Sequence, residues 1–148
     1  MGVTAVAKTK PSREEAVLLE LVRTADILSR RPAELLKAAE LSPTQYNVLR
    51  ILRGAAEPLT CGEIGKRMIT RDPDITRLLD RLKKRGLISR RREARDRRTV
   101  LVQITPAGLA LLARLDEPIQ DLHRSQLGHL GEKRLRQLSE LLSACRNG

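Results

Sequence analysis

Aromatic residues are almost absent from this sequence: its 148 residues include one Tyr and no Trp or Phe. A hydrophobic core must therefore consist of Leu, Ile, Val and Ala, a composition that favours helices. Proteins that read RNA usually stack bases on aromatic side chains, and a single Tyr cannot supply such a surface. The scarcity of aromatics thus argues against a protein that binds single-stranded nucleic acid.

Cysteine and histidine are equally scarce. Cys61 and Cys145 are too few for a disulfide framework and too far apart for a CxxC metal site. His123 and His129 are six residues apart, with no ligand residues at metal-binding spacing around them. We therefore expect no metal and no cofactor. The sequence also lacks GxSxG, Gly-rich phosphate-loop and HExxH motifs, so we do not expect an enzyme.

Long apolar runs are missing too. The longest, residues 107–113, is far shorter than the roughly 20 residues that span a bilayer. Residues 1–10 hold only a short, mildly apolar stretch, which does not fit the apolar region of a secretory signal. We expect residues 1–12 to form a loose tail. We also expect that the protein has no membrane partner and is located in the cytoplasm.

What the sequence has in excess is positive charge, with 29 Lys and Arg against 18 Asp and Glu and a formal net charge of +11. Residues 66–98 hold 14 of these Lys and Arg and five acidic residues, a net charge of +9. A solvated basic face is the ordinary explanation for any one such side chain. Their concentration in one segment instead indicates a polyanionic partner, above all double-stranded DNA.

Helix caps divide the chain into elements. Ser12, Ser42 and Thr60 are each followed three residues later by Glu or Gln, which is the capping-box pattern of a helix start. Helices are predicted at residues 13–31, 32–39, 43–53, 61–68, 73–85, 106–127 and 132–145, and a β-hairpin with an arginine-rich tip at residues 87–104.

Proline sets two of these boundaries. Pro32 disfavours helix in the residue before it, so the first helix is predicted to end at Arg31. Asp72 and Pro73 fit the N-cap and first position of the helix at residues 73–85, and Gly86 fits a glycine just beyond its end.

This order of elements predicts a mainly α fold with a small β-wing. Two short helices followed by a basic hairpin form the layout of a winged helix–turn–helix, whose second helix lies in the major groove of DNA. We expect this DNA-binding lobe to span residues 42–105.

The helices at residues 13–41 and 106–146 carry more apolar surface than so small a lobe can cover. We therefore expect them to form a homodimer, with packing of these helices within one chain as the alternative. The expected dimerisation residues are Val17, Leu21, Leu28, Leu135, Leu138 and Leu142.

The helix at residues 73–85 is the candidate reader of DNA bases. Its apolar residues recur at helical spacing and must face the core, which leaves a polar set outward. The expected base-reading residues are Asp74, Thr76, Arg77 and Arg81. Arg77 leads this set because arginine can donate two hydrogen bonds to one guanine. For Asp80 we favour an ion pair with Lys84, four residues on, over recognition of cytosine.

The hairpin and its flanks supply the remaining candidates. Arg95, Arg97 and Arg98 lie at the tip, where a narrow minor groove would attract arginine, and Asp96 is expected to orient a neighbouring guanidinium. The expected phosphate contacts, which add affinity without sequence information, are Lys66, Arg67, Arg71, Arg90 and Arg91.

An ordered set of motifs in residues 13–146 resembles the multiple-antibiotic-resistance regulator (MarR) family. The motifs are LSPTQYNVL (residues 41–49), LTCGEI (59–64), ITRLLDRL (75–82), RGLI (85–88), DRR (96–98) and ITPAG (104–108). The resemblance implies an obligate homodimer that represses or activates at pseudo-palindromic operators. It also implies that Arg98 reaches the minor groove and that Asp96 orients it. Gly65 departs from the family, which usually has alanine there, and residues 70–74 are more charged than in most members.

The resemblance further implies a possible effector. Many members bind small phenolic or lipophilic ligands between the dimerisation helices and the DNA-binding lobe. In this chain such a cleft would be lined by Leu, Ala and Val, which fits a lipophilic effector or none. Some relatives instead sense hydroperoxides through a cysteine, and Cys61 leaves that alternative open, although structural packing is the favoured interpretation of this residue.

We therefore expect a sequence-specific DNA-binding regulator, most simply a repressor, located in a prokaryotic cytoplasm and associated with the nucleoid. The main alternative is an architectural nucleoid protein that binds DNA without base discrimination. The two differ in the affinity ratio between specific and random DNA, which should be on the order of 10³ or more for a regulator.

Overall fold

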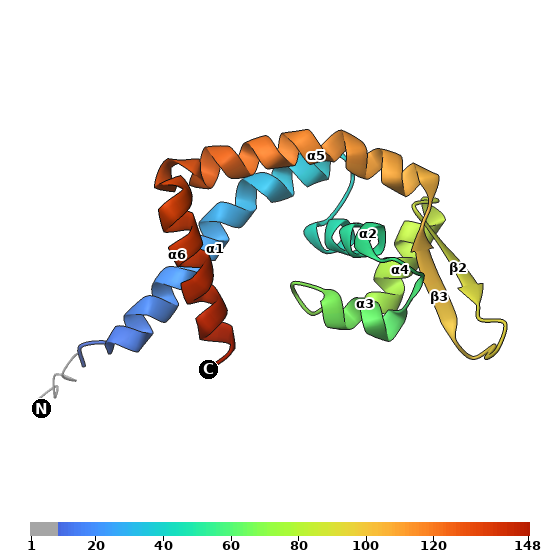
Figure 1. Ribbon diagram of the computed structural model, residues 1–148, viewed down its shortest axis with the longest axis horizontal. Coiled ribbons are helices and arrows are strands. Elements are labelled where there is room, and N and C mark those ends of the chain that lie inside the picture. The colour runs from blue at the N-terminus through green and yellow to red at the C-terminus, as the bar shows by residue number, and fades with distance from the viewer. Residues whose placement is uncertain (1–8) are drawn as a thin grey trace, which may run out of the picture.

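The computed structural model describes residues 9–148 (Figure 1). Its elements are α1 (Arg13–Ala38), α2 (Pro43–Gly54), β1 (Leu59–Thr60), α3 (Cys61–Arg67), α4 (Ile75–Lys84), β2 (Ile88–Arg92), β3 (Val100–Ile104), α5 (Pro106–Leu127), the 3-10 helix η1 (Gly128–Leu130) and α6 (Gly131–Arg146). This confirms the mainly α fold with a small β-wing. Most of the predicted tail, residues 1–8, lies outside the described residues.

The prediction that the first helix stops before Pro32 is wrong, because α1 runs through this proline to Ala38. Proline lacks the N–H that would bond to the carbonyl four residues earlier. That carbonyl belongs to Leu28, and it accepts a hydrogen bond of 3.0 Å from Nε2 of Gln126 on α5. A side chain of a distant helix thus satisfies the group that Pro32 leaves free.

The predicted capping boxes at Ser42 and Thr60 are both complete, and the Ser12 hydroxyl accepts from the backbone N–H of Glu15. The Glu63 carboxylate accepts a hydrogen bond from the Thr60 backbone, which lowers the pKa of Glu63. A carboxylate in the first turn of a helix also interacts favourably with the positive end of the helix dipole. Local hydrogen bonding therefore fixes these three helix starts where the sequence predicts them.

The start of α4 differs from the prediction. Asp74, not Asp72, is its N-cap, and its side chain accepts from the backbone N–H of Arg77. The Asp72 carboxylate accepts instead from the N–H of Asp74, at 2.8 Å, and so closes a turn ahead of the helix. The predicted glycine beyond the helix end is confirmed, since Gly86 has φ of 72°.

The sheet has the strand order β1-β3-β2, and both pairs are antiparallel. Thr60 pairs with Leu101 of β3 and also caps α3, so one residue joins the sheet to the helix that follows it. The two-residue strand β1 was not predicted, because it exists only through its pairing with a strand some forty residues later.

The core lies within the winged lobe and continues to the face of α5 that packs on it. It includes Val48, Leu49, Ile64, Leu79 and Leu82, together with Leu112 of α5. In contrast, α1 contributes only Leu36 to the buried set and α6 contributes nothing. Figure 1 shows the C-terminal part of α1 alongside α5, its N-terminal part extending away from the lobe, and α6 turning back from the end of α5 that is farther from the lobe. Among residues 9–148, no helix is long and apolar enough to span a membrane.

Candidate nucleic-acid interface

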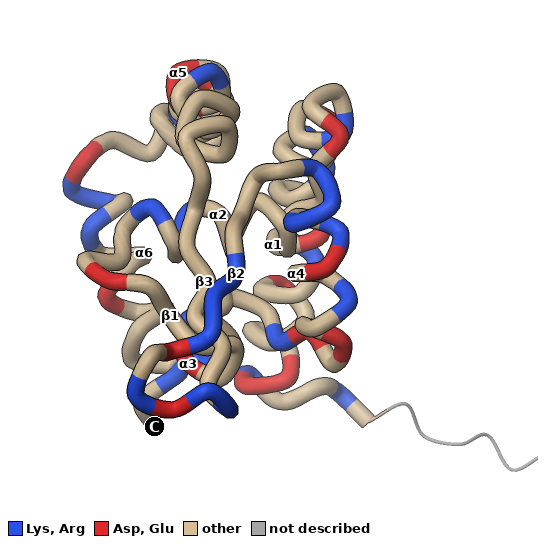
Figure 2. The backbone as a smooth tube through the Cα atoms, turned by 90° about the vertical axis from the view of Figure 1, so that its right-hand side faces the viewer, with Lys and Arg blue, Asp and Glu red and all other residues tan. Residues whose placement is uncertain are grey.

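Basic residues gather on α4, on the turn after it and on the β2–β3 hairpin. Figure 2 shows Lys and Arg along β2 and around the hairpin tip. Helix α4 and the hairpin adjoin because α4 packs its buried leucines against the core beside the sheet. These leucines are Leu78, Leu79 and Leu82. The fold therefore brings the positive charge of residues 66–98 onto adjoining elements.

All four predicted base-reading residues lie on the exposed side of α4 or at its start, namely Asp74, Thr76, Arg77 and Arg81. Two of them form a pair: Nε of Arg77 is 3.2 Å from Oδ2 of Asp74. Leu78 and Leu79 are buried behind them. Base contacts by this set remain a prediction, for which the required exposure is present.

The predicted pairing of Asp80 with Lys84 is wrong. Asp80 instead accepts a hydrogen bond of 2.6 Å from Nη1 of Arg90, on β2. Nη2 of Arg90 also lies 3.4 Å from the backbone carbonyl of Thr76, and the Arg90 side chain is only 20% exposed. Arg90 thus ties the wing to α4. Its role as a phosphate contact stays a prediction, but much of its hydrogen-bonding capacity is already used within the lobe.

The hairpin tip is held by backbone-directed hydrogen bonds. Asp96 accepts from the N–H of Arg98, at 3.0 Å, and from the hydroxyl of Thr99. Arg92 donates to the carbonyl of Arg97, at 2.7 Å. Among the described residues Asp96 forms no ion pair, and its orienting of a guanidinium stays a prediction. It orders the turn that carries Arg98.

The exposed arginines of the tip are Arg95, Arg97 and Arg98. Four of the five predicted phosphate contacts are also exposed, Lys66, Arg67, Arg71 and Arg91, while Arg90 is partly buried. No sequence pattern could have identified the Arg90–Asp80 pair, because the two residues lie on different elements and their contact depends on how the wing folds back.

Two further contacts join the lobe to the long helices. Arg53 of α2 donates to both carboxylate oxygens of Asp116 on α5, at 2.8 and 3.0 Å. These hydrogen bonds lower the pKa of Asp116 and raise the pKa of Arg53. On the other side, Arg85 donates to the backbone carbonyls of Glu40 and Ala39 at the end of α1.

An apolar groove of about 570 Å³ lies between α1 and α6. It is lined by five of the six predicted dimerisation residues, Val17, Leu21, Leu28, Leu138 and Leu142, together with Leu127. Leu135 is half-buried and does not line it. Other large apolar side chains of these helices are also exposed, including Leu18, Leu19, Val22, Ile27 and Leu141.

A second cleft, of about 690 Å³, opens where the end of α1, the α4–β2 turn and α5 meet. Its apolar wall includes Leu35, Leu87 and Leu111, and two guanidinium groups, those of Arg85 and Arg114, line it as well. The two cysteines lie elsewhere: Cys61 is half-buried at the start of α3, and Cys145 is exposed near the end of α6.

The chain has clear relatives among known proteins. The family model described as "MarR family" matches residues 41–100. The multiple antibiotic resistance protein MarR of Salmonella typhimurium is 34% identical over 108 residues, which cover 72% of this chain and 74% of that protein. The chain belongs to the MarR family.

Two further comparisons extend the match to the whole MarR-family architecture. The crystal structure of a MarR transcription factor from Planctomyces limnophilus is 41% identical, covers 93% of this chain and 99% of its own, and superposes with a TM-score of 0.70. The HTH-type transcriptional repressor IacR of Pseudomonas putida is 27% identical over 130 residues, or 88% of this chain and 77% of that protein. The chain is a DNA-binding transcriptional regulator, and these relatives are regulators rather than enzymes, as expected.

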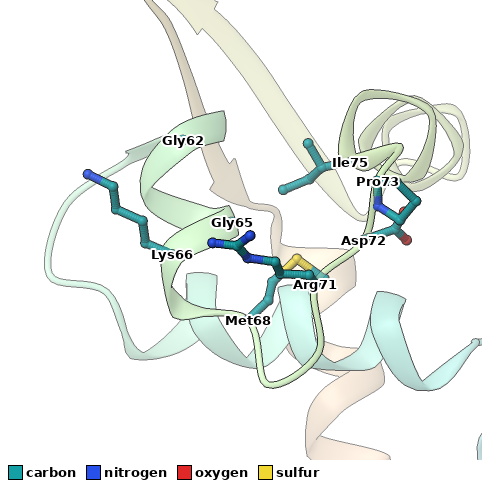
Figure 3. A pocket seen from close by; sticks show the side chains of 8 residues that line it. All are labelled: Gly62, Gly65, Lys66, Met68, Arg71, Asp72, Pro73 and Ile75. Atoms are coloured by element: carbon teal, nitrogen blue, oxygen red, sulfur yellow. The ribbon is translucent and has the colours of Figure 1, made fainter.

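One departure from the usual MarR-family sequence lies beside α4. Gly62 and Gly65 of α3 line a hollow of about 660 Å³ between α3 and the start of α4, together with Ile75. Figure 3 shows Lys66 pointing away from this hollow and Arg71 among the residues that line it. A Cβ atom at position 65 would meet only Ile75, at 3.8 Å, so the alanine common in the family would fit.

Proposed function

We propose that this protein is a homodimeric, sequence-specific repressor that binds a pseudo-palindromic operator. The observation that carries the proposal is the combination of one basic reading face per chain with an apolar groove on α1 and α6 that one chain leaves uncovered. A second copy, related by a two-fold axis, would cover the groove and supply the second reading face.

In such a dimer each α4 would enter a major groove and each hairpin tip the adjacent minor groove. The two recognition helices would then lie roughly 34–36 Å apart, one turn of B-form DNA. The relative from Pseudomonas putida is named a repressor, which supports repression over activation.

The second cleft supports regulation by a small amphipathic anion. Its leucine-lined wall suits an apolar body, and the guanidinium groups of Arg85 and Arg114 suit a carboxylate. A ligand there would compete with the carbonyls of residues 39 and 40 for Arg85. Benzoate and octanoate, each compared with the matching alcohol, are suitable probes: the acids should weaken operator binding more than the alcohols, and Arg114→Met should remove the difference.

The decisive experiment selects binding sites from random DNA with the purified protein and compares the affinity for selected and random duplexes. We expect a two-fold symmetric consensus and an affinity ratio on the order of 10³ or more. A ratio near one would favour an architectural DNA-binding protein instead. Repeating the assay with peroxide on the wild type and on Cys61→Ser tests a cysteine-based redox sensor.

Light scattering on free protein and complex gives the oligomeric state. We expect a dimer in both, and Leu142→Glu in the groove should shift the free protein toward monomer. Surface substitutions away from the groove, such as Lys133→Glu, should not. A wild-type chain that stays monomeric on the selected DNA would contradict the proposal.

A further inference from the structure

The carboxylate of Asp74 has two separate contacts, and both are with Arg77. Its Oδ1 accepts from the backbone N–H of Arg77 at 3.2 Å, which is the cap of α4. Its Oδ2 lies 3.2 Å from Nε of the same arginine. The cap requires only one oxygen, and Ser, Thr or Asn could supply it equally well. The second contact is therefore additional to capping.

This second contact favours one orientation of the guanidinium, with its Nε side toward Asp74. Arginine offers hydrogen-bond donors on its Nε side and at its Nη1–Nη2 end. Asp74 lies against the Nε side as an ion-pair partner, and no other side-chain partner of Arg77 exists among residues 9–148. The Nη1–Nη2 end stays free on a side chain that is 71% exposed. That end matches the paired O6 and N7 acceptors of guanine in the major groove.

Electrostatics argue against a role for Asp74 in general affinity. A carboxylate at the start of the reading helix repels DNA phosphates, and Asp72 beside it adds a second negative charge. An acidic residue at this place weakens non-specific binding while it restrains the arginine that would read a base. Both effects increase the difference between the correct sequence and all others.

We infer that Asp74 is a positioning residue that presents Arg77 end-on to guanine, so that each half-site contains one G·C pair read by Arg77. The inference rests on the proposed function and adds to it the identity of one operator base pair. Asp74 acts through Arg77 and need not touch the DNA itself.

The test measures competition binding to a selected site and to variants in which the G·C pair is replaced by each other pair. Wild type should prefer G·C by at least about fivefold, and Arg77→Ala should abolish that preference. Asp74→Ser keeps a capping hydroxyl but removes the second contact. It should reduce the same preference by roughly two- to fivefold, at that position only, with equal or higher affinity for random DNA.

Asp72→Asn is the matched control, since it removes the same charge two residues earlier and keeps the oxygen that closes the turn. It should raise affinity for all sequences without changing the preference at any position. In an Arg77→Ala background, Asp74→Ser should have no further effect on preference. Asp74→Thr, which also caps, provides a second test variant, and thermal melts verify that each variant is folded.

The outcomes separate the two proposals. Equal G·C preference in wild type and Asp74→Ser would overturn the inference, as would a loss spread evenly over all positions, which indicates a merely structural role. A consensus without any G·C pair sensitive to Arg77→Ala would overturn it too. If wild type does not distinguish selected from random DNA, the proposed function itself fails.

Discussion

Arg53 and Asp116 are 63 residues apart in the sequence and form a bidentate ion pair, with Nη–Oδ distances of 2.8 and 3.0 Å. The first lies at the end of α2 in the winged lobe and the second near the middle of α5. Two parallel hydrogen bonds define an orientation as well as a distance. The pair therefore helps to set the angle at which the lobe is carried by the long helix.

Removing this pair should lower the stability of the fold and loosen the orientation of the lobe on α5. Asp116→Asn is expected to lower the free energy of unfolding by about 1 kcal/mol or less, since both side chains are partly exposed to solvent. Urea denaturation measures the change. Asp121→Asn, which breaks an exposed ion pair with Arg124 within α5, is the control and should have a smaller effect. A larger loss from the control would contradict the importance of the cross-helix pair.

The same pair should make stability depend on acid pH. The hydrogen bonds from Arg53 lower the pKa of Asp116 in the folded chain. A carboxylate whose folded pKa is lowered contributes stability that is complete above its unfolded pKa, about 3.9, and that disappears as the pH falls through the lower folded value. Between pH 5 and pH 2, in steps of roughly one unit, wild type should therefore lose more stability than Asp116→Asn. Parallel curves for the two proteins would show that the pair does not contribute.

Gly108 should tolerate no side chain. An added Cβ atom would lie 2.4 Å from the carbonyl oxygen of Leu87 and 2.6 Å from Cγ1 of Ile104. The Leu87 carbonyl cannot easily move, because it accepts from the N–H of Thr105 at 3.1 Å. Gly108→Ala is expected to destabilise the fold by about 1–3 kcal/mol.

Gly65→Ala is the matched control for Gly108→Ala. The site has room for a methyl group, and alanine in a helix is favoured over glycine, so a gain of about 0.5–1 kcal/mol is expected. Thermal melts of the two variants give the comparison. Similar melting temperatures would show that the contacts around Gly108 adapt to the methyl group.

Substitutions of Arg90 and Arg91 should distinguish a residue that stabilises the lobe from one that contacts DNA. Neighbouring strand residues point to opposite faces, and the structure pairs Arg90 with Asp80 while Arg91 is exposed. Arg90→Met is expected to lower stability by about 1 kcal/mol. Arg91→Met should leave stability unchanged but reduce the slope of log affinity against log salt concentration by roughly one. If the two variants behave alike in both assays, the assignment of Arg90 to the lobe interior is wrong.

The sequence predicts best what is decided locally. The helix starts at Ser12, Ser42 and Thr60 depend on a side chain three residues from its partner, and the outward face of α4 follows from the spacing of its leucines. Both could be anticipated without tertiary information. The same holds for the glycine beyond the end of α4, whose positive φ no other residue adopts as easily.

What the sequence does not reveal depends on partners from elsewhere in the chain. The continuation of α1 through Pro32 needs Gln126, 98 residues from the carbonyl it satisfies. The partner of Asp80 proved to be Arg90 on the wing rather than the lysine one helical turn away. The shift of the α4 cap from Asp72 to Asp74 reflects competition between two chemically identical caps, which spacing alone does not resolve.

Thr60 serves two elements at once, as the last residue of β1 and as the cap of α3. Arg90 makes an equivalent link at the opposite edge of the sheet, between β2 and α4. A shear between the wing and the two helices would break one or the other of these contacts, so we expect the three elements to move together. We expect any adjustment to curved or unevenly spaced DNA sites to strain the contacts behind these elements, those of Arg53 with Asp116 and of Arg85 with residues 39 and 40.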